Sequence, residues 1–124
     1  MKKYLGVDWG EKRIGLAIAN SELKMALPFK TISSLAELLT LIETEEIDEL
    51  ILGQPIKLSG QAADNPQWLE FVKKLNQLSQ VKVRLVDERL SSLAADALFS
   101  GLKEQAPRDE TAAMIILQNY LDAN

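Results

Sequence analysis

The order of the hydrophobic patterns along the chain is the feature that most constrains its fold. Three short apolar segments, at residues 4–9, 14–19 and 25–32, come first and predict three consecutive strands. From residue 34 onward, spacings typical of helices alternate with segments typical of strands. Because neighbouring strands are followed by alternating units, we expect a mixed sheet with helices on both faces, which is an α/β architecture.

A short polar segment, Glu11, Lys12 and Arg13, joins the first two strands. Such a short connection predicts a hairpin. The third strand contains Pro28, which has no N–H group to donate to a neighbouring strand. We therefore expect the third strand to lie at an edge of the sheet.

Capping residues mark the starts of two helices. Ser34 and Glu37 have the spacing of a capping box, and Asn65 with Pro66 combines a favoured N-cap with a proline in the first turn. The apolar residues of the first helix fall on one face: Leu35, Leu38, Leu39 and Ile42. The expected buried face of the second helix, with Trp68 beside it, is Leu69, Val72 and Leu75.

The remaining elements complete one domain. A short buried strand is expected at residues 50–52, a further strand at 81–86, and helices at about 91–101 and 109–121. The full order is β-β-β-α-β-α-β-α-α. A chain of 124 residues has the length of one domain of ordinary size, so we expect residues 1–124 to form a single domain.

The chain contains no histidine and no cysteine, which excludes much of enzyme chemistry. Disulfides, thiol nucleophiles, Ser-His-Asp triads and most zinc sites all need one of the two. Any reaction must therefore use carboxylates, hydroxyls, Lys or Arg, backbone amides, or a hard metal ion bound by oxygen. The lack of cysteine fits a reducing cytosol, and no apolar segment approaches the ~20 residues that span a membrane, so we expect a cytoplasmic protein with no membrane partner.

The net charge of −4 comes from 14 basic and 18 acidic residues. Five of the acidic residues lie within seven positions: Glu43, Glu45, Glu46, Asp48 and Glu49. The simplest interpretation of this run is a solvated helix end and loop. Outside the run, 14 basic residues face 13 acidic residues, so a local basic surface is compatible with the overall acidity.

Carboxylates at three places in the chain do not fit a solvated face. Asp8 lies in the first strand, where a buried carboxylate is costly unless it is paired or binds a metal. Asp87 and Glu88 follow the strand at residues 81–86, at the carboxyl end where α/β proteins bind ligands. Asp109 begins the last helix. Oxygen donors without His or Cys suit Mg²⁺ or Mn²⁺, and two such ions ~3.5–4 Å apart can activate water and stabilise the leaving oxygen of a phosphodiester.

Each of these residues also has a structural interpretation. Asp8 could cap the adjacent turn, and Asp109 is a good helix N-cap. One of Asp87 and Glu88 is expected to be structural, because adjacent strand residues point to opposite faces of a sheet. Only the coincidence of all three positions favours a metal site.

The glycine-rich hairpin at residues 6–15 could bind phosphate. Glycines beside a strand carboxylate let a phosphate group approach the backbone, and Lys12 and Arg13 could contact it. The alternative is an ordinary hairpin with a basic turn.

Four motifs in order along the chain identify a family. They are Gly6-Val7-Asp8-Trp9-Gly10 with Lys12-Arg13-Ile14-Gly15; Gly53-Gln54-Pro55 with Gly60; Asp87-Glu88-Arg89-Leu90-Ser91-Ser92; and Asp109 ahead of Ala112-Ala113 and residues 116–121. With these motifs, the chain resembles over nearly its whole length the YqgF family, also called RuvX, of small bacterial proteins with a ribonuclease H-like fold. Members are described as Holliday junction resolvases or as nucleases that mature the end of pre-16S ribosomal RNA. The family usually has an aromatic residue, commonly tyrosine, after the strand aspartate, and this chain has Trp9 there; it has Ser91 and Ser92 where the family usually has two threonines.

The resemblance implies catalytic, metal-binding carboxylates at Asp8, Glu88 and Asp109, with Asp87 as the second choice to Glu88, and a pair of Mg²⁺ or Mn²⁺ ions. Many ribonuclease H-like enzymes have a carboxylate at the end of the strand beside the first. Here that strand, at residues 50–52, ends without one, so Glu88 would take that role. The resemblance also implies contacts with nucleic acid from a further set of residues: Gly10, Lys12, Arg13, Gln54 and Arg89.

We therefore expect a divalent-metal-dependent nuclease that acts on structured RNA, with the precursor end of 16S ribosomal RNA as the favoured substrate and ribosomal particles as partners. Branched DNA, cut by a Holliday junction resolvase, is the second choice. We expect a monomer or a weak homodimer. A monomer would favour RNA, because a junction resolvase normally works as a two-fold dimer, for which Trp68 or Phe71 could supply the surface.

Two other classes of function stay open. A nucleotide-binding ATPase or sugar-kinase relative uses a similar Asp-containing hairpin, but it clamps nucleotide between two domains, and this chain has the length of one. A non-catalytic module that binds RNA or ribosomes would need to neutralise phosphates, which the net negative charge disfavours.

Overall fold

The computed structural model describes residues 1–55, 65–87 and 108–123. The elements are β1 (Lys3–Trp9), β2 (Ile14–Asn20), β3 (Leu27–Ile32), α1 (Leu35–Thr44), β4 (Glu49–Gln54), α2 (Pro66–Leu78), β5 (Lys82–Asp87) and α4 (Arg108–Ala123). The helix expected at about residues 91–101 lies outside the described residues, as do Glu88 and Arg89. The other expected elements are present in the expected order.

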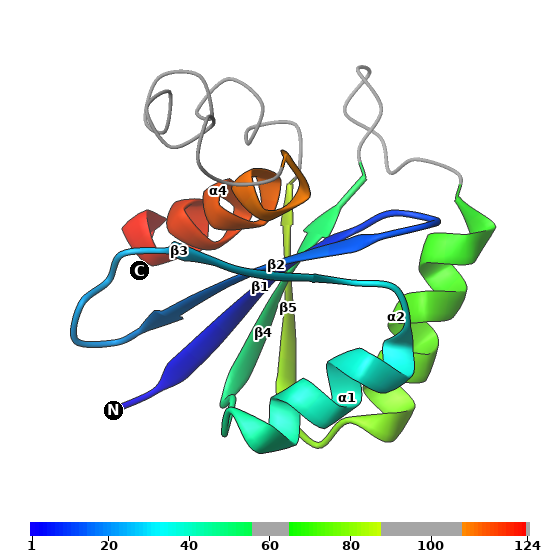
Figure 1. The fold of residues 1–124 in the computed structure, drawn as a ribbon, viewed down its shortest axis with the longest axis horizontal. Coiled ribbons are helices and arrows are strands. Elements are labelled where there is room, and N and C mark those ends of the chain that lie inside the picture. Colours follow the sequence, from blue (N-terminus) through cyan, green and yellow to red (C-terminus); the bar gives the residue numbers. More distant parts are fainter. Residues whose placement is uncertain (56–64, 88–107, 124) are drawn as a thin grey trace.

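The five strands form one mixed sheet in the order β3-β2-β1-β4-β5 (Figure 1). The hairpin of β1 and β2 and the pairing of β2 with β3 are antiparallel, whereas β4 is parallel to both β1 and β5. Strand β3 lies at an edge, as Pro28 predicts. Ala17 pairs with Pro28 while Leu16 pairs with Lys30, so Phe29 forms a bulge next to the proline.

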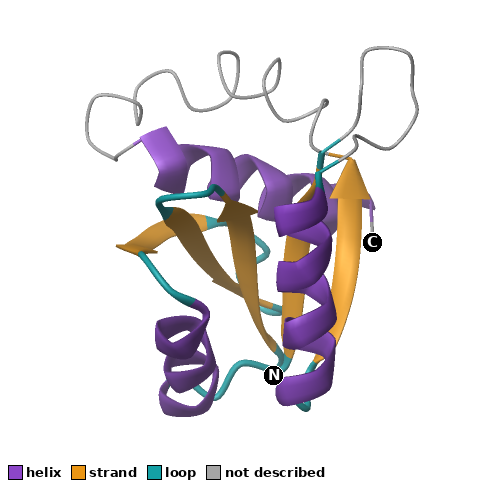
Figure 2. Ribbon diagram, turned by 90° about the vertical axis from the view of Figure 1, so that its right-hand side faces the viewer, coloured by secondary structure: helices purple, strands orange, loops and turns teal. Residues whose placement is uncertain are grey.

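Helices cover both faces of the sheet (Figures 1 and 2). One face of the sheet packs against α1 and α2. The core between them contains strand and helix residues, among them Leu5, Val7, Leu16, Leu38, Ile42, Leu50, Leu52, Phe71 and Leu75. The other face packs against α4, and the core between them contains Ala17, Ala19, Ile51, Ala113, Met114, Ile116 and Leu117. The expected α/β architecture is therefore confirmed. Within the described ranges, no helix is both long enough and apolar enough to cross a membrane.

Both capping predictions are confirmed. Ser34 is the N-cap of α1, and its Oγ accepts a hydrogen bond from the backbone N–H of Glu37 at 3.2 Å. Asn65 is the N-cap of α2, and its Oδ1 accepts from the backbone N–H of Trp68 at 3.1 Å. Each cap satisfies an N–H group that has no partner within its own helix.

The predicted buried face of α2 is partly wrong. Trp68, Phe71 and Leu75 are buried, whereas Leu69 is 56% exposed. The helix is turned so that its two aromatic side chains face the core, because these rings remove more apolar surface from water than Leu69 would. Trp68 is 4% and Phe71 7% exposed, so neither presents the large exposed ring that the suggested dimer surface would need.

Helix α4 lies directly on the backbone of β1. A Cβ atom added to Gly6 would lie 2.7 Å from the backbone oxygen of Ala113 and 2.8 Å from Cβ of Leu117. Such distances are closer than real Cβ atoms approach other heavy atoms, so only glycine fits here. Gly6 therefore fixes the height of α4 above the sheet.

Candidate functional site

Three of the residues singled out from the sequence lie at one edge of the sheet. Strands β1, β4 and β5 are parallel, so their carboxyl ends meet at the same edge. Asp8 is next to the end of β1, and Gln54 and Asp87 end β4 and β5 and pair with each other. This edge is the candidate site.

Asp8 lies on the face of the sheet that α4 covers. Its neighbour Val7 belongs to the cluster beneath α1 and α2, whereas Gly6 contacts α4. Because strand side chains alternate between faces, Asp8 shares the side of Gly6. Its side chain is partly exposed.

The start of α4 lies over the row of strand residues that contains Asp8. Thr31 of β3 pairs with Gly15 of β2, which pairs with Asp8 of β1. The Oγ1 of Thr31 donates a hydrogen bond to Oε2 of Glu110, in the first turn of α4, at 2.9 Å. The backbone of Asp109, one residue earlier, therefore lies near the same end of the sheet; its side chain lies outside the described part of the structure.

Asp87 lies on the other face of the sheet. Val86 packs against α4 and Val83 against the opposite core, which sets the alternation along β5. Asp87 therefore points to the same face as Val83, the face that α1 and α2 cover, whereas Asp8 lies on the opposite face. By the same alternation Gln54 follows Leu52, a residue of the α1–α2 core, onto the same face as Asp87.

The turn between β1 and β2 presents basic side chains at this end of the molecule. Lys12 and Arg13 are both exposed. A Cβ atom on Gly10 would lie 2.8 Å from the backbone oxygen of Arg13, so the tight turn itself requires glycine. Gly10 thus has a structural role, and the two basic side chains beside it are exposed.

The residue types of the chain would suit a hard divalent cation. The chain has no His or Cys, so any metal site must be built from oxygen, the donor that Mg²⁺ and Mn²⁺ prefer. In the described ranges, no group of three or more His, Cys, Asp or Glu side chains is arranged to hold a metal. Two of the three expected ligands, Glu88 and the side chain of Asp109, lie outside those ranges.

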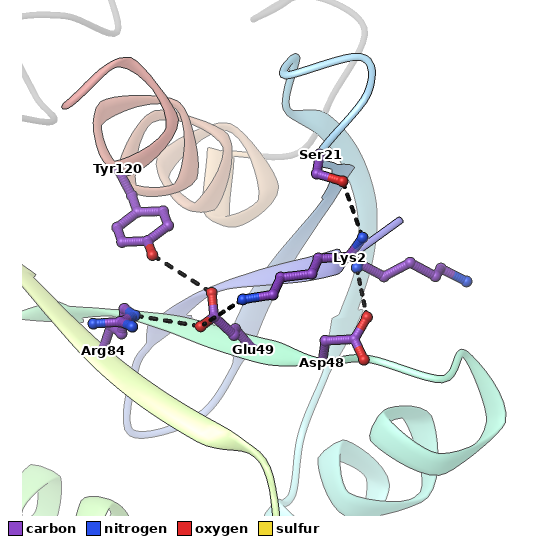
Figure 3. Close-up of polar contacts among 7 residues, drawn as sticks. Lys2, Ser21, Asp48, Glu49, Arg84 and Tyr120 are labelled. Atoms are coloured by element: carbon purple, nitrogen blue, oxygen red, sulfur yellow. Dashed lines mark hydrogen bonds and ion pairs between the residues drawn. The ribbon is translucent and has the colours of Figure 1, made fainter. Parts of the chain in front are cut away.

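A second polar cluster, not predicted from the sequence, lies at the opposite edge of the sheet (Figure 3). Glu49, the first residue of β4, is only 4% exposed. Its Oε1 lies 3.5 Å from Nε of Arg84 and 3.9 Å from Nζ of Lys2, and the hydroxyl of Tyr120 donates to its Oε2 over a long 3.5 Å. The interpretation of the acidic run as entirely solvated is therefore wrong at Glu49, which folds into the sheet and finds cationic partners.

Hydrogen bonds beside this cluster fix the first residues of the chain. The backbone N–H of Lys2 donates to Oγ of Ser21 at 2.9 Å, and that of Lys3 donates to Oδ2 of Asp48 at 2.8 Å (Figure 3). Asp48 is exposed, as the solvated interpretation expects. These bonds fix the amino-terminal end of β1 and so help to fix the position of Asp8 along the sheet.

Burial and the charge of Glu49 raise the pKa of Tyr120 above its ordinary value of 10.0. Its ring also contacts Tyr4 edge-on, with 6.0 Å between the ring centroids, and Arg84 lies 6.0 Å from its centroid. The tyrosine therefore ties the last turns of α4 to β1, β4 and β5. A sequence signal for this cluster exists: Glu49 directly precedes the buried strand segment at residues 50–52, where a strand start is as reasonable as a loop.

Comparison with known proteins agrees with the fold and the motifs. The model of the RuvX family, described as Holliday junction resolvase, matches residues 2–123. A protein named "Putative pre-16S rRNA nuclease" from Chloroflexus aurantiacus is 32% identical over 131 aligned residues, which cover 96% of this chain and 86% of that protein. A protein of the same name from Maridesulfovibrio salexigens is 35% identical, covering 96% of this chain and 97% of its own length.

Solved structures of junction resolvases share the fold. T. thermophilus RuvC in complex with Holliday junction substrate has a TM-score of 0.62 at 16% identity, with 99% of this chain and 95% of that chain covered. The Fowlpox virus resolvase in complex with Holliday junction DNA has a TM-score of 0.63 at 13% identity, with 98% and 97% covered. The mixed sheet with α4 on one face is thus the ribonuclease H-like fold of RuvC-like resolvases. By its family match and its relatives, this chain belongs to the RuvX (YqgF) family.

Proposed function

We propose that this chain is a divalent-metal-dependent nuclease that hydrolyses phosphodiester bonds in the maturation of the pre-16S ribosomal RNA end. The observation that carries the proposal is the place of Asp8, a carboxylate at the carboxyl end of β1 on the α4 face, in a chain whose curated relatives carry the name pre-16S rRNA nuclease. Such work belongs to the cytoplasm, where ribosomal particles would be its partners.

Asp8, Glu88 and Asp109 are proposed as the ligands of two Mg²⁺ or Mn²⁺ ions. Alternation along β5 supports Glu88 over Asp87, because Asp87 follows Val83 onto the opposite face from Asp8. The hydrogen bond between Thr31 and Glu110 supports Asp109, because it holds the first turn of α4 over the row of Asp8.

The metal ions and the residues of the chain have separate roles in the proposed reaction. When bound, the two ions activate a water molecule for attack on phosphorus and stabilise the leaving oxygen. The three carboxylates hold the ions, and their mutual repulsion makes the site bind divalent cations in preference to monovalent ones. Lys12 and Arg13 are exposed in the β1–β2 turn and, together with Arg89, contact phosphates of the substrate.

Cleavage of branched DNA is the second candidate function. The RuvX family model is described as Holliday junction resolvase, and both resolvase structures bind such junctions. A resolvase cuts two strands symmetrically and so works as a two-fold dimer. The burial of Trp68 and Phe71 removes the aromatic residues that the sequence offers for a dimer surface, and this favours RNA and a monomer or weak homodimer.

Side-by-side cleavage assays test the function. A short precursor 16S RNA end and a synthetic four-way DNA junction are each incubated with the protein in Mg²⁺, Mn²⁺ or EDTA. We expect metal-dependent cutting of the RNA and none of the junction. Cutting of the junction alone would support the resolvase, and cutting of neither by folded protein would contradict both and favour a binding module.

Two adjacent residues offer a matched test of the ligand set. Glu88→Gln and Asp87→Asn each remove one negative charge without changing the size of the side chain. We expect Glu88→Gln to abolish cleavage and Asp87→Asn to retain it. The reverse pattern would make Asp87 the ligand and overturn the assignment by alternation.

A further inference from the structure

A groove opens beside Trp9, on the face of the sheet opposite to Asp8. Its volume is about 490 Å³, within the range of pockets that bind small ligands. Its apolar lining is formed by two aromatic and two aliphatic side chains: Trp9, Phe71, Leu35 and Pro66. The rings of Trp9 and Phe71 lie 6.1 Å apart between centroids and are tilted by 37°.

The polar edge of the groove is unsuited to phosphate. It carries the carboxylates of Glu11 and Glu70, and the charge of Lys74 is already paired with Glu70 at 3.7 Å. Carboxylates repel a phosphate, but they accept hydrogen bonds from the exocyclic amino groups of a base, and Gln67 and Lys74 can donate to ring nitrogens and carbonyl oxygens. An aromatic lining with donors and acceptors at its edge matches a nucleobase.

One residue of the groove, Trp9, adjoins the candidate site along the chain. Trp9 directly follows Asp8, so their Cα atoms are ~3.8 Å apart, while their side chains point to opposite faces. In this mode of binding, a nucleic-acid strand with a phosphate at Asp8 would pass the end of β1 and place an adjacent base beside Trp9. Gln54 ends β4 at the same edge and on the same face as Trp9.

The size of the groove argues against a protein partner. Eight of the residues that the structure describes line it, whereas a stable protein interface takes roughly 20–30 residues from each side. We propose that the groove binds one unpaired nucleobase of the substrate, next to the cleaved phosphodiester, with the face of the base against Trp9. This inference rests on the proposed nuclease function and names a base-binding subsite for it.

Fluorescence of Trp9 tests the subsite directly. Trp68, the other tryptophan, is buried, and its Nε1 has no hydrogen-bond partner among the described residues. Trp68→Phe therefore loses no such bond and leaves Trp9 as the reporter. This variant is titrated at low salt in Mg²⁺ with an eight-nucleotide single-stranded RNA whose phosphorothioate linkages resist cleavage, and with an abasic chain of the same length.

We expect the RNA to quench Trp9 and the abasic chain to bind about five- to a hundredfold more weakly, since stacking of one base on an aromatic ring contributes that much. Equal binding of both chains would overturn the subsite. So would binding of the RNA, followed by anisotropy, without a change in Trp9 emission, or no binding at all. Emission that shifts with protein concentration alone would make a second copy the occupant, and would also overturn it.

Cleavage kinetics separate the subsite from the nuclease. Trp9→Leu should raise KM about five- to a hundredfold with little change in kcat, and Trp9→Tyr, which keeps an aromatic face, should restore KM. Urea unfolding of both variants shows whether they are folded. Full cleavage by Trp9→Leu with unchanged KM would overturn the subsite alone, whereas quenching by RNA without any cleavage by the wild type would overturn the nuclease alone.

Discussion

Gly6 of β1 lies in direct contact with Leu117 of α4, with room for no side chain between them: a Cβ atom on Gly6 would lie 2.8 Å from Cβ of Leu117. The helix therefore rests on the strand backbone two residues before Asp8. Because the first turn of the same helix contains Asp109, the contact sets the spacing between two of the proposed ligands.

Gly6→Ala should destabilise the fold by about 1–3 kcal/mol, because the added methyl group forces α4 away from the sheet. Urea unfolding measures this loss. Cleavage should fall further than the folded fraction does, because the displaced helix carries Asp109. An unchanged urea midpoint would show that α4 does not rest on Gly6.

The orientation of α2 predicts unequal effects of two leucine substitutions. Leu75 is fully buried and Leu69 is exposed. Leu75→Ala should lower the free energy of unfolding by about 2–5 kcal/mol, and Leu69→Ala should change it by less than about 0.5 kcal/mol. Both are measured by urea unfolding. Equal losses would show that Leu69 is buried as deeply as Leu75, which is the helical face expected from the sequence.

The raised pKa of Tyr120 predicts a loss of stability at high pH. The fold favours the neutral phenol, because burial and Glu49 oppose its ionisation. The stability that comes from this preference is complete below the ordinary pKa of 10.0 and is lost as the pH rises through the higher pKa of the folded state.

Tyr120→Phe is the matched control for that loss, because phenylalanine cannot ionise and the two proteins are otherwise identical. The difference in unfolding free energy between wild type and Tyr120→Phe should be constant up to about pH 9 and should fall above about pH 10. A difference that does not change with pH across this range would show that Tyr120 ionises equally in the folded and unfolded states.

Most of the fold could be predicted because its signals are local. Ser34, Asn65 and Pro28 act through backbone groups of their own or neighbouring segments, and each has the predicted role. The face of α2 could not be predicted in the same way. Leu69 and Phe71 are both apolar, and the choice between them depends on Trp9, which reaches α2 only through the tertiary fold.

The candidate site could likewise be predicted only where the signals are local. Residue type and the strand pattern are enough to predict Asp8 at the carboxyl end of a central strand. The choice between Asp87 and Glu88 depends on which face Val83 and Val86 occupy, which only the packing of α4 reveals. The burial of Glu49 could not be predicted for a similar reason, since Arg84 and Tyr120 are distant in sequence.

The central claim is that Asp8 holds the metal ions of a nuclease. The most direct measurement is single-turnover cleavage of the precursor 16S RNA end in Mg²⁺ by wild type and Asp8→Asn, with urea unfolding of both proteins. We predict that Asp8→Asn remains folded and cuts no RNA. Cleavage at the wild-type rate by pure, folded Asp8→Asn would contradict the account.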